Sequence, residues 1–151
     1  MDATEKQREH VAILCQKTGT TANLITKDCD ALLQEANEPL NEEQIVNIGT
    51  IRKASQKLRS IADEVNQAIS NGIPLWAEQE ETSYFMTVLA HDLKDPIMLI
   101  LGFSQVNLKG ITGSLSDRQK ETMEHIHRLG HMLTSSIEES LLRANGIFKE
   151  L

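Results

Sequence analysis

The sequence predicts an all-α protein, an antiparallel four-helix bundle built from two helical hairpins. Apolar residues recur at steps of three and four along four long segments, which is the period of an amphipathic helix. Short stretches of about seven residues separate the segments within each pair, a length that favours antiparallel neighbours. Of the 151 residues, 40% are hydrophobic and only 3% are aromatic, so the composition favours helices over sheets packed with aromatic side chains.

The first hairpin is expected to span residues 1–73. Its first helix, residues 4–36, has an apolar stripe on one face. Asn41 with Gln44 three residues later has the spacing of a capping box and predicts the start of the second helix. The residues of the two stripes are Val11, Leu14, Cys15, Ala22, Ile25, Cys29, Leu32 and Leu33 in the first helix, and Gln44, Ile48, Ile51, Ser55, Leu58, Ala62, Val65 and Ile69 in the second.

The second hairpin, residues 74–151, follows the same plan. Its first helix is expected over residues 75–109, and Ser116 with Gln119 has the capping-box spacing that predicts the start of the last helix. Both helices again step by three and four. The expected core positions are Met86, Leu89, Leu93, Pro96, Ile100 and Phe103, then Gln119, Met123, Ile126, Gly130, Leu133, Ile137 and Leu141.

The two hairpins align without a gap at an offset of 75 residues, so that Leu14 falls on Leu89 and Leu58 on Leu133. We interpret this as an internal duplication. The alternative is that two amphipathic hairpins of equal length match in their apolar positions by chance. A duplicated chain is expected to be a monomer that imitates a dimer. Without duplication, a homodimer formed through the second hairpin is expected.

Charge and cysteine content narrow the possible partners. The net charge of −7 argues against a nucleic-acid partner, which would require a basic face. No run of about 18 apolar residues occurs, so no membrane span is expected. Cys15 and Cys29 are the only cysteines, and two thiols this far apart on one helix cannot pair. A reducing, cytoplasmic location fits best.

The expected third helix contains AHDLKDPI, residues 90–97, in which polar residues and a proline interrupt an apolar pattern. His91 lies about 200° around the helix from the neighbouring core positions and is expected to face solvent. An exposed imidazole near a carboxylate, here Asp92, is a candidate nucleophile. Lys94 and Asp95 lie one turn further on the same face. Pro96 is expected to bend the helix. A plain solvated face is the alternative interpretation.

These residues resemble the H-box of the histidine-kinase dimerisation and phosphoacceptor domain, whose pattern is His, acidic, apolar, basic, Thr or Asn, and Pro. The resemblance covers residues 80 to about 145. It implies a four-helix bundle, His91 as the phosphoacceptor, and Asp92 as the base toward the other ring nitrogen. Asp95 replaces the usual Thr or Asn, which is linked to phosphatase activity in the family. The stretch also resembles, less closely, the motif of single-chain histidine phosphotransfer proteins.

Two further features depart from a complete kinase. No Gly-rich phosphate loop or Asn-bearing nucleotide motif occurs, so no ATP-dependent autokinase activity and no cofactor are expected. The sequence aligned with the H-box in the first hairpin is HVAILCQKTGTT, residues 10–21, where Gln16 replaces His91. Glutamine cannot carry a phosphoryl group, so one active site per bundle is expected.

The resulting hypothesis is a histidine-containing phosphotransfer module of a two-component phosphorelay. It would accept a phosphoryl group at His91 and pass it on, with a response-regulator receiver domain or a separate histidine kinase as partner. Two alternatives remain. The bundle is either a non-catalytic interaction module that binds such a partner, or a fragment of a longer sensor histidine kinase.

Metal binding is not expected from the sequence. His127 and His131 are four residues apart on the expected last helix and could share a metal ion. No third ligand is evident from the spacing, and a polar face beside the core is the simpler interpretation.

Overall fold

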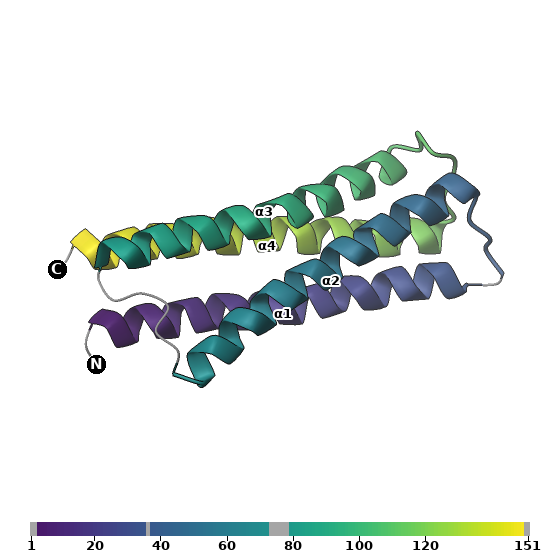
Figure 1. Ribbon diagram of the computed structural model, residues 1–151. Helices are drawn as coiled ribbons and strands as arrows, with labels where there is room; N and C mark the ends of the chain where they lie inside the picture. Colours follow the sequence, from purple (N-terminus) through teal and green to yellow (C-terminus); the bar gives the residue numbers. More distant parts are fainter. Residues whose placement is uncertain (1–2, 36, 73–78, 150–151) are drawn as a thin grey trace.

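The computed structural model describes the backbone of residues 3–35, 37–72 and 79–149 and the side chains of residues 5–35, 37–72 and 85–143. Its secondary structure consists of four long helices, so the all-α prediction is confirmed for the described part of the chain (Figure 1). The helices are α1 (Ala3–Gln34), α2 (Glu42–Ser70), α3 (Gln79–Leu108) and α4 (Asp117–Lys149).

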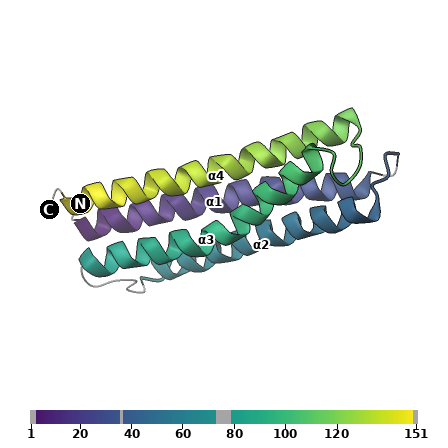
Figure 2. The same ribbon diagram turned by 90° about the horizontal axis from the view of Figure 1, so that it is seen from above.

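The four helices form an antiparallel bundle in which each helix contacts two neighbours. The contacts run α1–α2, α2–α3, α3–α4 and α4–α1, and α1 and α3 also meet in a few places across the bundle. Figure 2 shows both ends of the chain at one end of the bundle and the α1–α2 and α3–α4 loops at the other. The two hairpins therefore pack against each other through the α2–α3 and α4–α1 contacts.

Buried side chains follow the predicted stripes on all four helices. Four predicted positions are only partly buried against the core, namely Val65, Ile69, Phe103 and Leu141. Leu33 is exposed (37%) in the last turn of α1, while the preceding Leu32 is buried. Leu32 lies three residues after Cys29 and Leu33 lies four residues after it, and only Leu32 is buried in the core. The largest fully buried side chains are Val11, Leu14, Ile25, Ile48, Ile51, Leu58, Met86, Leu93, Ile97, Ile100, Met123 and Ile126.

Both predicted capping boxes are present. Asn41 accepts a hydrogen bond at Oδ1 from the backbone N–H of Gln44 (2.8 Å), and Gln44 Oε1 accepts one from the N–H of Asn41 (3.0 Å). At the start of α4, Ser116 and Gln119 make the same pair of bonds at 3.1 and 2.9 Å. These bonds satisfy donors that the first turn of a helix leaves unpaired.

The same cap residues also join the two loops. Asn41 Nδ2 donates to the carbonyl oxygen of Thr112 (2.6 Å), and Ser116 Oγ donates to Glu38 Oε2 (2.7 Å). Gly113 allows this approach. Its φ of +122° suits glycine, and a Cβ atom there would lie only 2.7 Å from Nδ2 of Asn41. The loop end of the bundle is therefore held by polar contacts between the hairpins.

One predicted helix boundary lies outside the described residues. The third helix was expected from residue 75, but residues 75–78 lie outside the described residues, and α3 begins at Gln79 within them. The threonines and glycine of residues 18–21 do not interrupt α1. Thr18 is buried there, and its hydroxyl donates to the carbonyl oxygen of Leu14 (2.8 Å), which satisfies the polar group inside the core.

Burial agrees between the two hairpins at the offset of 75 residues. Gln16 and His91 are both exposed at this offset, and Gln44 and Gln119 are both buried. Positions that are buried in both hairpins are 11 and 86, 14 and 89, 15 and 90, 18 and 93, 22 and 97, 25 and 100, 29 and 104, 32 and 107, 48 and 123, 51 and 126, 54 and 129, 55 and 130, 58 and 133, and 62 and 137.

Candidate functional site

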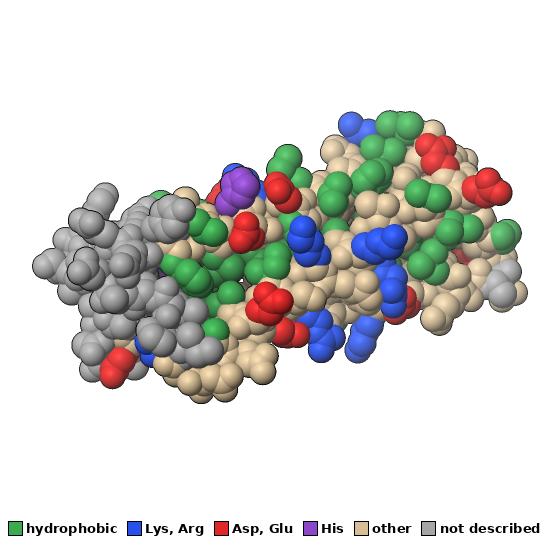
Figure 3. Space-filling model, in the orientation of Figure 1, with side chains coloured by type: hydrophobic (Ala, Val, Ile, Leu, Met, Phe, Trp, Pro, Cys, Tyr) green, Lys and Arg blue, Asp and Glu red, His purple; other side chains and the backbone are tan. Residues whose placement is uncertain are grey.

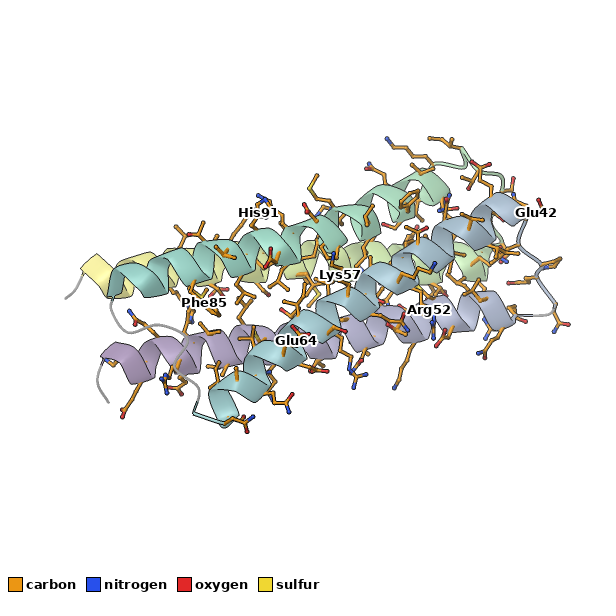
Figure 4. All side chains as sticks on the ribbon, viewed as in Figure 1. Glu42, Arg52, Lys57, Glu64, Phe85 and His91 are labelled. Atoms are coloured by element: carbon orange, nitrogen blue, oxygen red, sulfur yellow. The ribbon has the colours of Figure 1, made fainter. Side chains whose placement is uncertain are left out.

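Helix α3 presents His91 to solvent. Leu89 and Leu93 on either side of it are buried, and His91 itself is exposed, as helical periodicity predicts. Figure 4 shows the labelled His91 side chain pointing away from the bundle. In the same view drawn as a space-filling model, the histidine stands on the upper surface beside acidic and basic side chains (Figure 3). A partner protein can reach the imidazole without any movement of the bundle.

His91 is one of the residues that line a groove between α3 and α4, and we call it the His91 groove. It has a volume of about 250 Å³. His91 and Lys94 border it from α3, and Glu138 borders it from α4. The remaining lining residues, mostly apolar, are Thr87, Ala90, Ile97, Thr134, Ile137 and Leu141. The imidazole thus stands beside a mainly apolar surface with one cationic and one anionic side chain.

The other two predicted site residues lie apart from the groove. Asp92 and Asp95 are exposed but do not line it. Among the described residues, no hydrogen bond or ion pair connects His91 to either carboxylate. Successive residues project about 100° apart on a helix, so Asp92 is directed away from the imidazole. The structure brings together His91 and Lys94, and the predicted role of Asp92 stays a prediction.

Pro96 lies inside α3, which continues through it. Proline has no N–H, so the carbonyl oxygen of Asp92, four residues earlier, loses its usual helical donor. Figure 2 shows α3 changing direction along its length, which is the effect expected of a proline within a helix. Pro96 itself is buried, so its ring packs inward while His91 faces out.

Sequence reasoning missed the α4 side of the groove. Ile137 and Leu141 were expected in the core, but Thr134 and Glu138 had no assigned role. The Thr134 hydroxyl donates to the carbonyl oxygen of Gly130 (3.2 Å), and Glu138 is exposed. Both flank a predicted core position, Ile137, so the α3–α4 pairing was the signal that could have located them.

The matching place on the first hairpin is built differently. Gln16 occupies the position of His91, and Arg59 the position of Thr134. Arg59 Nη1 donates to Asn23 Oδ1 (2.6 Å), and its Nε lies 3.5 Å from Asp63 Oδ2. The arginine therefore bridges α2 to α1 from the position that Thr134 holds in the wall of the His91 groove.

The cysteines take no part in an exposed site. Cys15 and Cys29 are both buried and unpaired. Burial raises the pKa of each thiol to about 12, and the carboxylates of Asp28 and Asp30 add to the effect at Cys29. A thiol with this pKa is protonated at neutral pH and is a poor nucleophile or metal ligand.

Helix α4 holds three further histidines near the middle of the bundle. His125 Nδ1 is bonded to a carboxylate oxygen of Asp28 on α1. His127 Nδ1 lies 2.8 Å from Ser104 Oγ on α3, and His127 Nε2 lies 3.1 Å from His131 Nε2.

Within the described helices, none is long and apolar enough to cross a membrane.

Comparison with known proteins finds partial similarity to two longer proteins. The chain is 27% identical over 94 residues to the circadian input-output histidine kinase CikA of Synechococcus elongatus. The aligned residues cover 62% of this chain and 12% of the kinase. It is 26% identical over 110 residues to the non-motile and phage-resistance protein of Caulobacter vibrioides, covering 72% of this chain and 13% of that protein.

These similarities are limited in extent. No family model matches the chain, and no solved structure matches it. The chain matches only about one eighth of the length of either relative. The comparisons therefore establish weak, partial similarity between this four-helix bundle and a protein of the histidine-kinase class.

Proposed function

We propose that this protein is a histidine phosphotransfer module of a two-component pathway, with His91 as the phosphoacceptor. The observation that supports the proposal most directly is the place of His91, exposed on α3 and lining the His91 groove. The partial similarity to a histidine kinase points to the same chemistry. The two unpaired thiols suit the cytoplasm, where such a relay would act.

The proposed reaction transfers a phosphoryl group between histidine and aspartate. A lone pair on one imidazole nitrogen attacks the phosphorus of an aspartyl phosphate on a receiver domain. The new N–P bond forms as the P–O bond to the aspartate breaks, and the carboxylate leaves. The other ring nitrogen keeps its proton. The reverse reaction passes the group on, and a separate histidine kinase could load His91 in place of a receiver.

The groove would provide the docking surface. Its apolar walls, Ile97, Ile137 and Leu141, can be buried by an apolar helix of the receiver. Lys94 is three residues from His91 on the same side of α3 and borders the groove. Its ammonium group can approach the transferred phosphoryl oxygens and stabilise their charge. Asp92 and Asp95 stand outside the groove, where they would contact the rim of the partner.

Phosphotransfer is tested by incubating the protein with a phosphorylated receiver domain or an active histidine kinase. We expect acid-labile, base-stable phosphate on the wild type and on the control variant His125→Gln, and none on His91→Ala. Circular dichroism should show the same helix content for all three. Absence of phosphate on the wild type, or its survival in His91→Ala, would overturn the proposal.

A non-catalytic interaction module is the second candidate. The observation that favours it is the absence of a hydrogen bond from His91 to Asp92 or Asp95 among the described residues, which leaves the imidazole without an orienting carboxylate. Such a module would bind a receiver through the His91 groove without becoming phosphorylated. Binding that is retained in His91→Ala but lost in Ile137→Glu, together with no phosphate on the wild type, would establish it.

A further inference from the structure

The histidine pair of α4 has a geometry that sequence spacing alone cannot show. His127 Nε2 and His131 Nε2 face each other at 3.1 Å. Two nitrogens bound to one ion at about 2.0–2.1 Å lie about 3.3 Å apart in tetrahedral geometry and about 2.9 Å apart at a right angle. The observed separation falls between these values. A single ion can therefore be placed between the two nitrogens with little movement of the exposed His131 ring.

Ser104 on α3 is hydrogen-bonded to the ring of His127, with Oγ 2.8 Å from Nδ1. The Ser104 hydroxyl also lies within donating distance of the carbonyl oxygen of Leu101 (3.1 Å). When it donates its one proton to Leu101, Ser104 Oγ accepts a hydrogen bond from Nδ1 of His127. In this arrangement His127 has its proton on Nδ1, and the lone pair on Nε2 is directed toward His131. Metal-binding histidines have this arrangement, with the second ring nitrogen donating to a fixed acceptor.

Neutral imidazole is the form that binds a metal. Of the groups around the pair, Ser104 is a neutral hydroxyl, and His125 on the same helix is bonded to Asp28 on the side of α1.

We propose that His127 and His131 form a two-histidine binding site for a late first-row divalent transition metal ion. Both ligands would bind through Nε2. When His127 has its proton on Nδ1, the proton between the two Nε2 atoms belongs to His131, and on metal binding it moves to Nδ1 of His131 by exchange with water. No third histidine, cysteine or carboxylate joins the pair among the described residues. Water would fill the remaining coordination positions.

The identity of the ion follows from the ligands. Imidazole nitrogens bind Cu²⁺, Ni²⁺ and Zn²⁺, whereas Mg²⁺ and Ca²⁺ prefer oxygen ligands. For a given set of nitrogen ligands, Cu²⁺ binds more tightly than Ni²⁺ or Zn²⁺. We therefore expect affinity in the order of Cu²⁺ above Ni²⁺ and Zn²⁺, with no binding of Mg²⁺.

The site is tested by titrating the intact chain with CuCl₂, ZnCl₂ and MgCl₂ in a non-coordinating buffer at pH 7.5, followed by calorimetry. We expect one Cu²⁺ per chain at this site, and loss of that binding in both His127→Gln and His131→Gln. The control His125→Gln should bind like the wild type. Ser104→Ala should weaken binding by about 10- to 100-fold, the usual effect of removing a group that orients a ligand.

A second readout does not depend on calorimetry. Because the ion binds the folded chain through two residues one turn apart, Cu²⁺ should raise the thermal midpoint of the wild type and leave that of His131→Gln unchanged. Equal binding and equal thermal shifts in the two proteins would mean adventitious metal only, and would overturn the proposal. Binding of Mg²⁺ with the same affinity as Cu²⁺ would also overturn it.

Discussion

Gln44 and Gln119 make reciprocal hydrogen bonds across the loop end of the bundle. Gln44 Nε2 donates to the carbonyl oxygen of Ser114 (3.3 Å), and Gln119 Nε2 donates to the carbonyl oxygen of Glu38 (2.7 Å). Each glutamine also completes the capping box of its own helix. In each glutamine, the side-chain amide oxygen accepts a hydrogen bond at the start of its own helix, and the amide nitrogen donates one to the opposite hairpin.

Removal of either glutamine should destabilise the bundle. In Gln44→Ala and Gln119→Ala, a cap donor and a loop carbonyl both lose their partner at a buried position, so we expect each change to cost about 1–3 kcal/mol of unfolding free energy. The two bonds hold the same pair of loops, so the double variant should cost less than the sum. Urea denaturation measures all three values.

The control for this experiment is Thr50→Ala. The Thr50 hydroxyl donates to the carbonyl oxygen of Val46 on the exposed side of α2 (3.0 Å), so its loss should change the unfolding free energy by no more than about 0.5 kcal/mol. Full additivity of the glutamine variants would show that the two loops respond independently.

A second prediction concerns the number of partners, and it depends on the proposed phosphotransfer. Because Arg59 bridges α1 and α2 at the place that corresponds to the His91 groove, one bundle should bind one receiver. Gln16→His in a His91→Ala background should not restore phosphate acceptance. The double change Gln16→His with Arg59→Thr, in the same background, removes the bridge and imitates the second hairpin.

Analytical ultracentrifugation of the complex and phosphate labelling check this prediction. A complex with two receivers per chain, or labelling of Gln16→His alone, would contradict it. If the wild type binds no receiver, the proposed function fails instead, so the two failures are distinguishable.

A third prediction concerns pH. The folded chain holds the pKa of His127 below its ordinary value, so in the window between the two pKa values the unfolded chain binds more protons. The unfolding free energy should therefore fall as pH drops through about 6.5, and this contribution ends once both states are protonated. The substitution His127→Gln removes this pH-dependent contribution to the unfolding free energy. The difference between wild type and variant should shrink from pH 7.5 to pH 5, as measured by urea denaturation, and parallel curves would contradict the assignment.

A fourth prediction concerns the thiols. Since burial raises the pKa of Cys15 and Cys29 to about 12, neither should react with iodoacetamide in the folded protein at pH 8. Both should react in urea. An engineered Met98→Cys is the matched control, because Met98 is 62% exposed on α3, and its thiol should label at once. Rapid labelling of the native cysteines without urea would show that the core opens locally.

The fold and the exposure of His91 were predictable because both depend on local periodicity. Capping boxes and apolar stripes are set by residues three and four apart, and the structure contains them where the sequence placed them. The loop-to-loop bonds of Gln44 and Gln119 were not predictable, because they depend on how one hairpin lies against the other. The groove wall at Glu138 was missed for the same reason. The role of Asp92 came from its adjacency to His91 and from the family resemblance, and it stays a prediction.

All four helices belong to one polypeptide, and this has a consequence for how the bundle assembles. Pairing of the two hairpins is intramolecular, so its equilibrium follows the effective concentration set by the connecting segment rather than the amount of protein in solution. Dilution cannot separate the halves, and exchange of hairpins between chains would have to compete with this tethered pairing. Changes on one hairpin can therefore be made without being copied onto the other.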